Sequence, residues 1–183
     1  RFTFNLLTEL GKRVGVNDES LETILTSNLG IDGKTMITDI LTSIDSAADF
    51  YLKGMFNQAR QKLDIASVGV QLVQGAYAKE VFTRLDKRDV ERNAGITDSA
   101  TQHSWVQDVA ETIAGSRYED KDKIKTETTR LVTEITALRT MADNALGRAA
   151  KAFNDKDYEA AGMYASVATM GYGIINARLT MAS

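Results

Sequence analysis

The sequence predicts an all-α protein, an elongated bundle of six or seven helices, and three observations lead to this fold class. The 183 residues include no proline, where average usage would give roughly nine, and such chains are usually built from long uninterrupted helices. Apolar residues recur at the three- and four-residue spacing of amphipathic helices, and no segment shows the alternation of a strand. Hydrophobic residues make up 43% of the chain, enough for a core. We expect a single domain over 1–183, with related halves at about 1–95 and 96–183.

The first two predicted helices are short. One covers residues 3–15, and the next begins after a cap at Asn17 or Asp18 and stops near Gly30. The apolar side chains that place the first helix are Leu6, Leu7, Leu10 and Val14.

Two longer helices complete the first half. The third begins at Asp32–Gly33 and ends at about Lys53, and after a break at Gly54 the fourth runs over about 57–88. The fourth helix is apolar nearly all round between residues 63 and 77, which is typical of a helix that lies between neighbours. The expected apolar face of the third helix consists of Ile37, Ile40, Leu41, Ile44, Ala48 and Tyr51.

Three helices are predicted in the second half. Ser99 and Gln102 have the spacing of a capping box and open the first of them, which Gly115 can end. A long helix follows over about 119–154, and a last helix, rich in alanine and glycine, over about 157–181.

The two halves resemble each other at a shift of 102 residues. Residues 43–70 align with residues 145–172, and the identities fall on small residues, where helix backbones can approach closely. Duplication of a helical hairpin explains this pattern, and chance alignment of two alanine-rich helices is the alternative. The candidate residues for helix packing or interaction are Ala59, Ala66, Gly69, Ala161, Ala168 and Gly171.

Each aligned hairpin also resembles the tetratricopeptide repeat over about 30 residues. The resemblance rests on Phe56-x-x-Ala59 and Tyr158-x-x-Ala161, together with apolar residues that follow at helical spacing. It implies the turn and second helix of a hairpin, with a peptide-binding groove as a further expectation. The shift of 102 residues is longer than the family's repeat of about 34, and the family's proline is absent.

Composition excludes several classes of site. The chain has no cysteine, which rules out disulfides, zinc ribbons and cysteine nucleophiles, and its one histidine, His103, cannot form a multi-histidine metal site. We expect His103 to lie at an exposed edge of its helix. A net charge of −3 gives no global basic field that would recruit nucleic acid. The sequence therefore predicts no metal or cofactor and no nucleic-acid partner.

Two segments resemble functional motifs, but for each of them we expect a purely structural role. The loop at 30–35 (GIDGKT) is similar to a phosphate-binding loop, but Asn28 stands where the motif needs glycine, so we expect a glycine turn. Residues 160–177 contain no charge, which is barely enough for a membrane span. We expect a buried central helix there, with Tyr164 and Tyr172 in the core.

The acidic residues between 120 and 134 alternate with lysine and arginine and predict a solvated helix face.

These observations predict a non-enzymatic structural or protein–protein interaction protein. We expect its partner to be protein, in a homo-oligomer or as a subunit of a larger assembly, and we do not expect a membrane partner. Two alternatives stay open: a small-ligand-binding sensor bundle cut from a receptor, and an enzyme whose residues meet only in the fold. Because the first residue is Arg1 and not methionine, we expect a processed chain or an excised fragment. The sequence does not predict a compartment.

Overall fold

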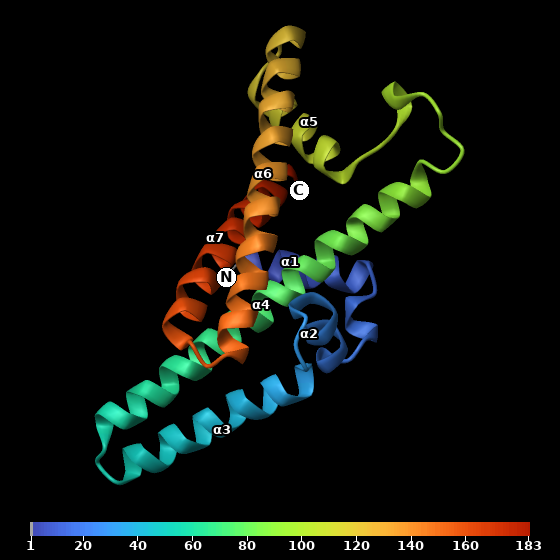
Figure 1. The fold of residues 1–183 in the computed structure, drawn as a ribbon. Helices are drawn as coiled ribbons and strands as arrows, with labels where there is room; N and C mark the ends of the chain where they lie inside the picture. Colours follow the sequence, from blue (N-terminus) through green and yellow to red (C-terminus); the bar gives the residue numbers. More distant parts are fainter. Residues whose placement is uncertain (1) are drawn as a thin grey trace. The chain divides into compact units, whose positions relative to one another are not determined.

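The protein is helical nearly throughout, and the predicted all-α class is confirmed. A computed structural model describes the backbone of residues 2–183 and the side chains from Leu6 onward; Arg1, on which the expectation of processing or excision rests, lies outside the described residues. This part of the chain forms seven α-helices and no strand (Figure 1). The helices are α1 (Phe2–Arg13), α2 (Leu21–Leu29), α3 (Gly33–Leu52), α4 (Phe56–Arg92), α5 (Trp105–Arg117), α6 (Lys121–Asn154) and α7 (Tyr158–Ala182).

The caps of α2 and α5 differ from those predicted. Asn17 and Asp18 belong to a short 3₁₀ helix, and Ser20, directly before α2, accepts the Thr23 amide instead. In the same way Ser104 caps α5. The predicted capping box at Ser99 lies in a separate 3₁₀ turn, so His103 lies in the loop before α5 and not within a helix. In both places the polar residue next to the helix displaces a more distant candidate, because its side chain reaches the free amides.

The chain divides into two compact units, each made of segments that are distant in sequence. Unit 1 contains the residues through Asn17, Glu80–Met141 and Gly171–Ser183, and unit 2 contains Asp18–Lys79 and Ala142–Met170. The long helices α4, α6 and α7 each contribute to both units. The units do not coincide with the halves 1–95 and 96–183, since each of them takes helices from both halves.

Aromatic and aliphatic side chains from α4, α5, α6 and α7 form the core of unit 1. The ring of Phe82 stacks on Trp105 with centroids 5.5 Å apart, and the centroid of the Tyr172 ring lies 5.9 Å from that of Phe82. The Trp105 indole N–H donates to Asp86 over 2.7 Å. A second cluster joins α5 to α6 through Ala110, Ile113 and Leu131.

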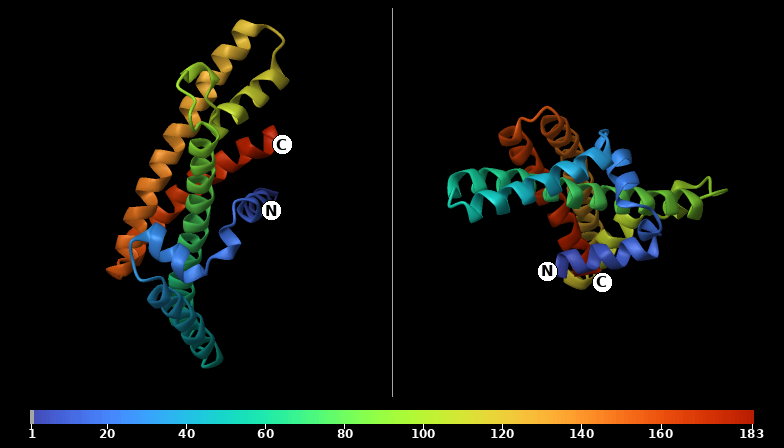
Figure 2. Two further views of the ribbon diagram at one scale, coloured as in Figure 1. Left: turned by 90° about the vertical axis from the view of Figure 1, so that its right-hand side faces the viewer. Right: turned by 90° about the horizontal axis from the view of Figure 1, so that it is seen from below.

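Small residues let the helices of unit 2 lie close together. A methyl group on Gly69 of α4 would overlap Ile40 of α3 and lie 3.6 Å from Phe153 of α6. A methyl group on Gly75 would lie 2.6 Å from Leu146, also on α6. Figure 2 shows the two hairpins concerned, α3 with the first part of α4, and α6 with α7. Helix α4 therefore packs against both α3 and α6.

Candidate interaction surfaces

The six residues singled out from the repeat are all buried. Gly69 contacts two neighbouring helices, and Ala161 and Ala168 of α7 are fully covered. These positions are therefore available for contacts within the chain but not for a partner, and any partner surface must lie elsewhere. The buried residues are Ala59, Ala66, Gly69, Ala161, Ala168 and Gly171.

The predicted apolar face of α3 is wrong in its orientation. Ile40 is buried as expected, but the other buried positions of α3 are Met36, Ser43 and Ala47, so the buried side is rotated away from the predicted centre. The apolar arc of α3 is wider than the neighbouring helices cover, and the remainder faces solvent. We call these exposed residues the α3 face: Leu41, Ile44, Ala48 and Tyr51.

The turn between α3 and α4 adds a cluster of exposed apolar side chains. Leu52 is 83% exposed, and the exposed rings of Tyr51 and Phe56 lie 5.4 Å apart across the turn. Further along α4, Leu63 and Val70 are exposed, so the prediction that this stretch is enclosed all round is wrong. An exposed apolar cluster of this kind is typical of an interaction site.

Helix α7 carries apolar residues on two opposite sides. One side is buried and includes Ala165, Ala168 and Ile175. The other side is largely open to solvent, with Met163 69% and Met170 67% exposed, so the prediction of a buried central helix is only half right. We call this open side the α7 seam: Ala160, Met163, Val167, Met170, Ile174, Ala177 and Met181.

The two tyrosines of α7 lie in different surroundings. Tyr172 is buried in the core of unit 1, as predicted, whereas Tyr164 is 37% exposed and the guanidinium of Arg148 lies 5.9 Å above its ring. Within the described helices no segment is long and apolar enough to cross a membrane.

An open polar hollow of about 880 Å³ lies in unit 1, beside the loop that precedes α5. His103 lines it and is exposed, as expected, and its backbone is held by Asn93, whose amide side chain both donates to and accepts from His103. Both carboxylate oxygens of Asp89 accept the Trp105 amide. Burial raises the pKa of Asp89, and the hydrogen bond from Trp105 opposes this shift. The hollow is lined by Asp89, Val90, Asn93, Ala94, Ser99, Ala100, Gln102, His103, Ser104, Gln107 and Glu111.

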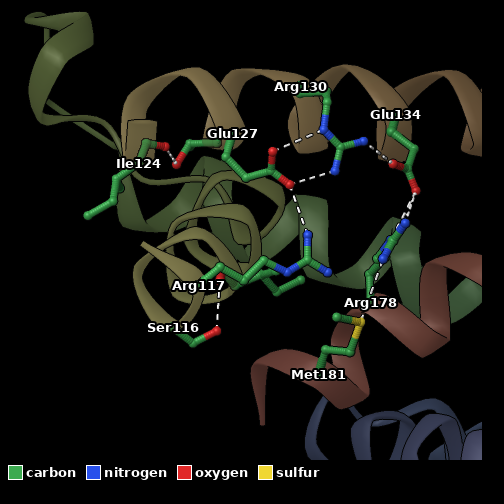
Figure 3. A network of polar contacts seen from close by, with 10 residues as sticks. Ser116, Arg117, Ile124, Glu127, Arg130, Glu134, Arg178 and Met181 are labelled. Atoms are coloured by element: carbon green, nitrogen blue, oxygen red, sulfur yellow. Dashed lines mark hydrogen bonds and ion pairs between the residues drawn. The ribbon is translucent and has the colours of Figure 1, made fainter. Parts of the chain in front are cut away.

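Two of the carboxylates expected on a solvated face instead join three helices of unit 1. Figure 3 shows Glu127 of α6 between Arg117 of α5, at 2.9 Å, and Arg130 of its own helix. Glu134 accepts from Arg130 and from Arg178 of α7, the latter at 2.8 Å. The hydrogen bond from Arg130 lowers the pKa of Glu127, with Arg117 adding to the effect. This network ties α5 and α7 to α6, which sequence spacing alone could not reveal.

The glycine turn at 30–35 has its backbone amides engaged by the chain itself. Asp32 accepts the amide of Lys34 and the hydroxyl of Thr35, which lowers the pKa of the Asp32 carboxyl. The amide of Gly33 donates to Thr26 of α2. These donors hold the start of α3, and a methyl group on Gly33 would overlap the Glu22 carbonyl, so the turn serves the close contact of α2 with α3.

Comparison with known protein families, characterised proteins and solved structures gives no match for this chain. Among the described residues no group of three or more acidic, histidine or cysteine side chains could hold a metal ion.

Proposed function

We propose that the protein is a non-enzymatic helical interaction protein that binds a protein partner, either a second copy or another chain of an assembly. The observation that carries this proposal is the set of exposed apolar side chains of unit 2, at the turn between α3 and α4 and on α7. Its largest members are Tyr51, Leu52, Phe56, Met163 and Met170, each more than 60% exposed. Side chains of this size favour burial by about 1.5–3 kcal/mol each, so a partner that covers them gains free energy.

A comparison of the two hairpins supports the same function. At the shift of 102 residues, Ile44 and Tyr51 of α3 align with Leu146 and Phe153 of α6. The residues on α6 are 1% and 4% exposed, because α4 lies over them, whereas those on α3 are 42% and 64% exposed. The α3 face is thus a surface whose counterpart is covered by a helix. We infer that a helix from a partner covers the α3 face.

Duplication of the hairpin is part of this proposal. The turns that end α3 and α6 share their hydrogen bonds at the shift of 102: Met55 donates to Phe50 over 2.9 Å, and Asp157 donates to Ala152 over 2.9 Å. The ring pair Tyr51–Phe56 has its counterpart in Phe153–Tyr158, with centroids 5.4 Å and 5.5 Å apart. The tetratricopeptide-like pattern at the same turns stays a prediction, and the groove that it implies would be one form of the proposed partner site.

Site-specific photocrosslinking in the cells that make the protein tests this function. A photoreactive phenylalanine analogue replaces Leu52 at the turn or Leu41 on the α3 face, and the control carries it at the exposed Lys121 on α6. We expect discrete protein adducts from the first two positions and none from the control. Adducts that are equally frequent at all three positions, or absent from all three, would contradict the proposal.

Small-ligand binding is a second candidate function, and the polar hollow beside His103 is the observation that favours it. Its walls offer carboxylate, imidazole, hydroxyl and amide groups to a polar molecule. A screen of polar metabolites for a rise in melting temperature, repeated with Asn93→Ala, tests it. A rise with the parent chain that the variant loses would support this candidate, and no rise with any compound would reject it.

A further inference from the structure

The polar hollow beside His103 lies wholly within unit 1. Its walls are the end of α4, the loop at 93–104 and the first two turns of α5 (Figure 1). Asn93 joins the two ends of this loop, because its side-chain amide donates to the His103 carbonyl and accepts from the His103 amide, both over 2.7 Å. The volume of about 880 Å³ falls within the roughly 300–1,000 Å³ of small-ligand sites.

Two glutamine side chains in the wall are held so that their oxygens remain for a ligand. Gln102 donates its Nε2 to the Ile96 carbonyl over 3.2 Å, and Gln107 donates its Nε2 to the Glu111 carboxylate over 2.8 Å. A carbonyl and a carboxylate can only accept, so these contacts fix which end of each amide is the nitrogen. The nitrogen is the end that the chain holds, and the oxygen is the end left to accept from a ligand.

The backbone amides at the start of α5 are engaged by neighbouring side chains. The Trp105 amide donates to both carboxylate oxygens of Asp89, and the Gln107 amide donates to the Ser104 hydroxyl. Free amides at a helix N-terminus attract anions. Here the Asp89 carboxylate takes the place that an anionic ligand would need, so this end of α5 disfavours an anion in the hollow.

The charges of the lining point to the same ligand sign. Among the described residues that line the hollow, Asp89 and Glu111 carry carboxylates, and none is a lysine or an arginine. Arg92 lies next to Asp89 but is shared between two carboxylates, Asp89 at 3.8 Å and Asp108 at 3.4 Å. The hollow therefore has a negative surround that its nearest arginine does not neutralise.

Asp89 itself would gain from a bound cation. Burial raises the pKa of Asp89, and the charges of Asp86 and Asp108 add to this rise, against the Trp105 hydrogen bond and the charge of Arg92. A positive ligand close to Asp89 would favour its charged form.

We propose that the hollow binds a small organic cation rich in N–H groups, of the class of primary diamines. Ammonium groups donate to carboxylate and amide oxygens, and hydrogen bonds between opposite charges are the stronger ones. The inference rests on the second candidate function and gives that site its ligand class. It makes no use of the exposed apolar side chains of unit 2.

Proton NMR of the His103 ring tests the ligand class. His103 is the single histidine, so its ring signals need no further assignment. Titration with 1,4-diaminobutane at fixed pH should shift these signals to saturation. Succinate, which carries two carboxylates on a chain of the same length, and the uncharged 1,4-butanediol should leave them in place at equal ionic strength. The fully N-methylated diamine keeps both charges but has no N–H group, and it should bind several-fold more weakly.

A matched pair of variants tests the role of the lining charge. Glu111→Gln keeps an acceptor for Gln107 but removes the charge, and it should weaken diamine binding about fivefold, the effect of one unit charge at about 4 Å in water. Glu119→Gln removes an exposed carboxylate that does not line the hollow, and it should bind the diamine like the parent. Added salt should weaken binding to the parent through screening.

The outcomes separate this inference from the functions proposed above. His103 signals that stay in place at millimolar diamine, equal binding of the fully methylated diamine, or Glu111→Gln binding like the parent would each overturn it. A saturable shift with succinate instead would overturn the cation class and leave the ligand-binding candidate standing. The protein-interaction function is decided separately, by the photocrosslinking at Leu52 and Leu41.

Discussion

Gly54 and Lys156 occupy the same position in two turns that lie 102 residues apart. Gly54 has φ 74° and Lys156 has φ 64°, and Lys156 is the non-glycine residue that takes a positive φ among those described. The amide of Gly54 donates to Tyr51 over 3.0 Å, and that of Lys156 donates to Phe153 over 3.1 Å. The left-handed conformation that ends both helices suits glycine and is unfavourable for lysine.

Lys156→Gly should therefore stabilise the protein. The free energy gained by removing the left-handed strain exceeds the free-energy cost of the conformational entropy that glycine adds to the unfolded chain. We expect the free energy of unfolding to rise by about 0.5–1 kcal/mol. Gly54→Ala should lower it by about 1 kcal/mol for the converse reason. Urea unfolding of both variants measures these changes. If Lys156→Gly were destabilising, the two turns would not be equivalent.

Two glycines in unit 2 should respond oppositely to alanine. The methyl group of Gly75→Ala would lie 2.6 Å from the buried Leu146, and the resulting overpacking should lower the free energy of unfolding by about 1–3 kcal/mol. Gly147→Ala, on α6, meets nothing within 4 Å and should raise it by about 0.5–1 kcal/mol through helix propensity. Chemical denaturation compares the two directly. Equal effects of the two changes would mean that α4 and α6 do not pack at Gly75.

Loss of the Asp86 carboxylate should destabilise unit 1. Asp86 accepts the indole N–H of the buried Trp105 and pairs with Arg139, so Asp86→Ala leaves both donors without this acceptor. An unsatisfied buried donor costs about 1–3 kcal/mol. Trp105 is the single tryptophan, so the midpoint of unfolding can be followed by its fluorescence. Lys121→Ala, an exposed change, is the control and should stay within about 0.5 kcal/mol of the parent. A variant with the stability of that control would show that the hydrogen bond to Trp105 contributes nothing.

The network around Glu127 predicts a loss of stability in acid. The pKa of Glu127 is lower in the folded protein than in the unfolded chain, chiefly through the hydrogen bond from Arg130. The folded state then binds fewer protons than the unfolded chain. The ionised Glu127 carboxylate therefore stabilises the fold above the ordinary carboxyl pKa, and this stabilisation is lost as the pH falls through the lowered pKa. Glu127→Gln should lower the melting temperature at neutral pH and reduce its further fall on acidification. The exposed Glu91→Gln is the control, and an identical pH profile for both variants would contradict the prediction.

The helices themselves could be predicted from the sequence because each signal is local. The missing proline, the glycine breaks at Gly30 and Gly54, and the apolar spacing all act within a few residues, and the predicted third helix agrees with α3 to within about a residue. The buried side of α3 could not be predicted in this way. Its apolar arc is wider than its neighbours cover, and the close approach at Gly69 decides which part is enclosed.

The close contacts between helices could be predicted from small residues, but the exposed apolar side chains could not be placed. Small residues at matched positions indicated close helix contacts, and Ala161 and Ala168 are indeed buried, yet a surface for a partner requires the opposite side of the same helix. The uncharged span at 160–177 contained the sequence signal for that opposite side, because the residues of the α7 seam recur within it at spacings of three and four. Whether such a stripe is covered depends on contacts between distant segments, as does the pairing of Glu134 with Arg178.

Methionine oxidation measures most directly whether the exposed apolar surface is covered in the protein's own surroundings. Met163 and Met170 are 69% and 67% exposed in the single chain, and Met141, at 43%, serves as the internal reference. Limited oxidation of the purified chain at high dilution should modify Met163 and Met170 readily. If the proposed partner is present in a lysate of the cells that make the protein, the ratio of oxidation at Met163 and Met170 to that at Met141 should fall severalfold there. An unchanged ratio in both preparations would contradict the claim that this surface binds a partner.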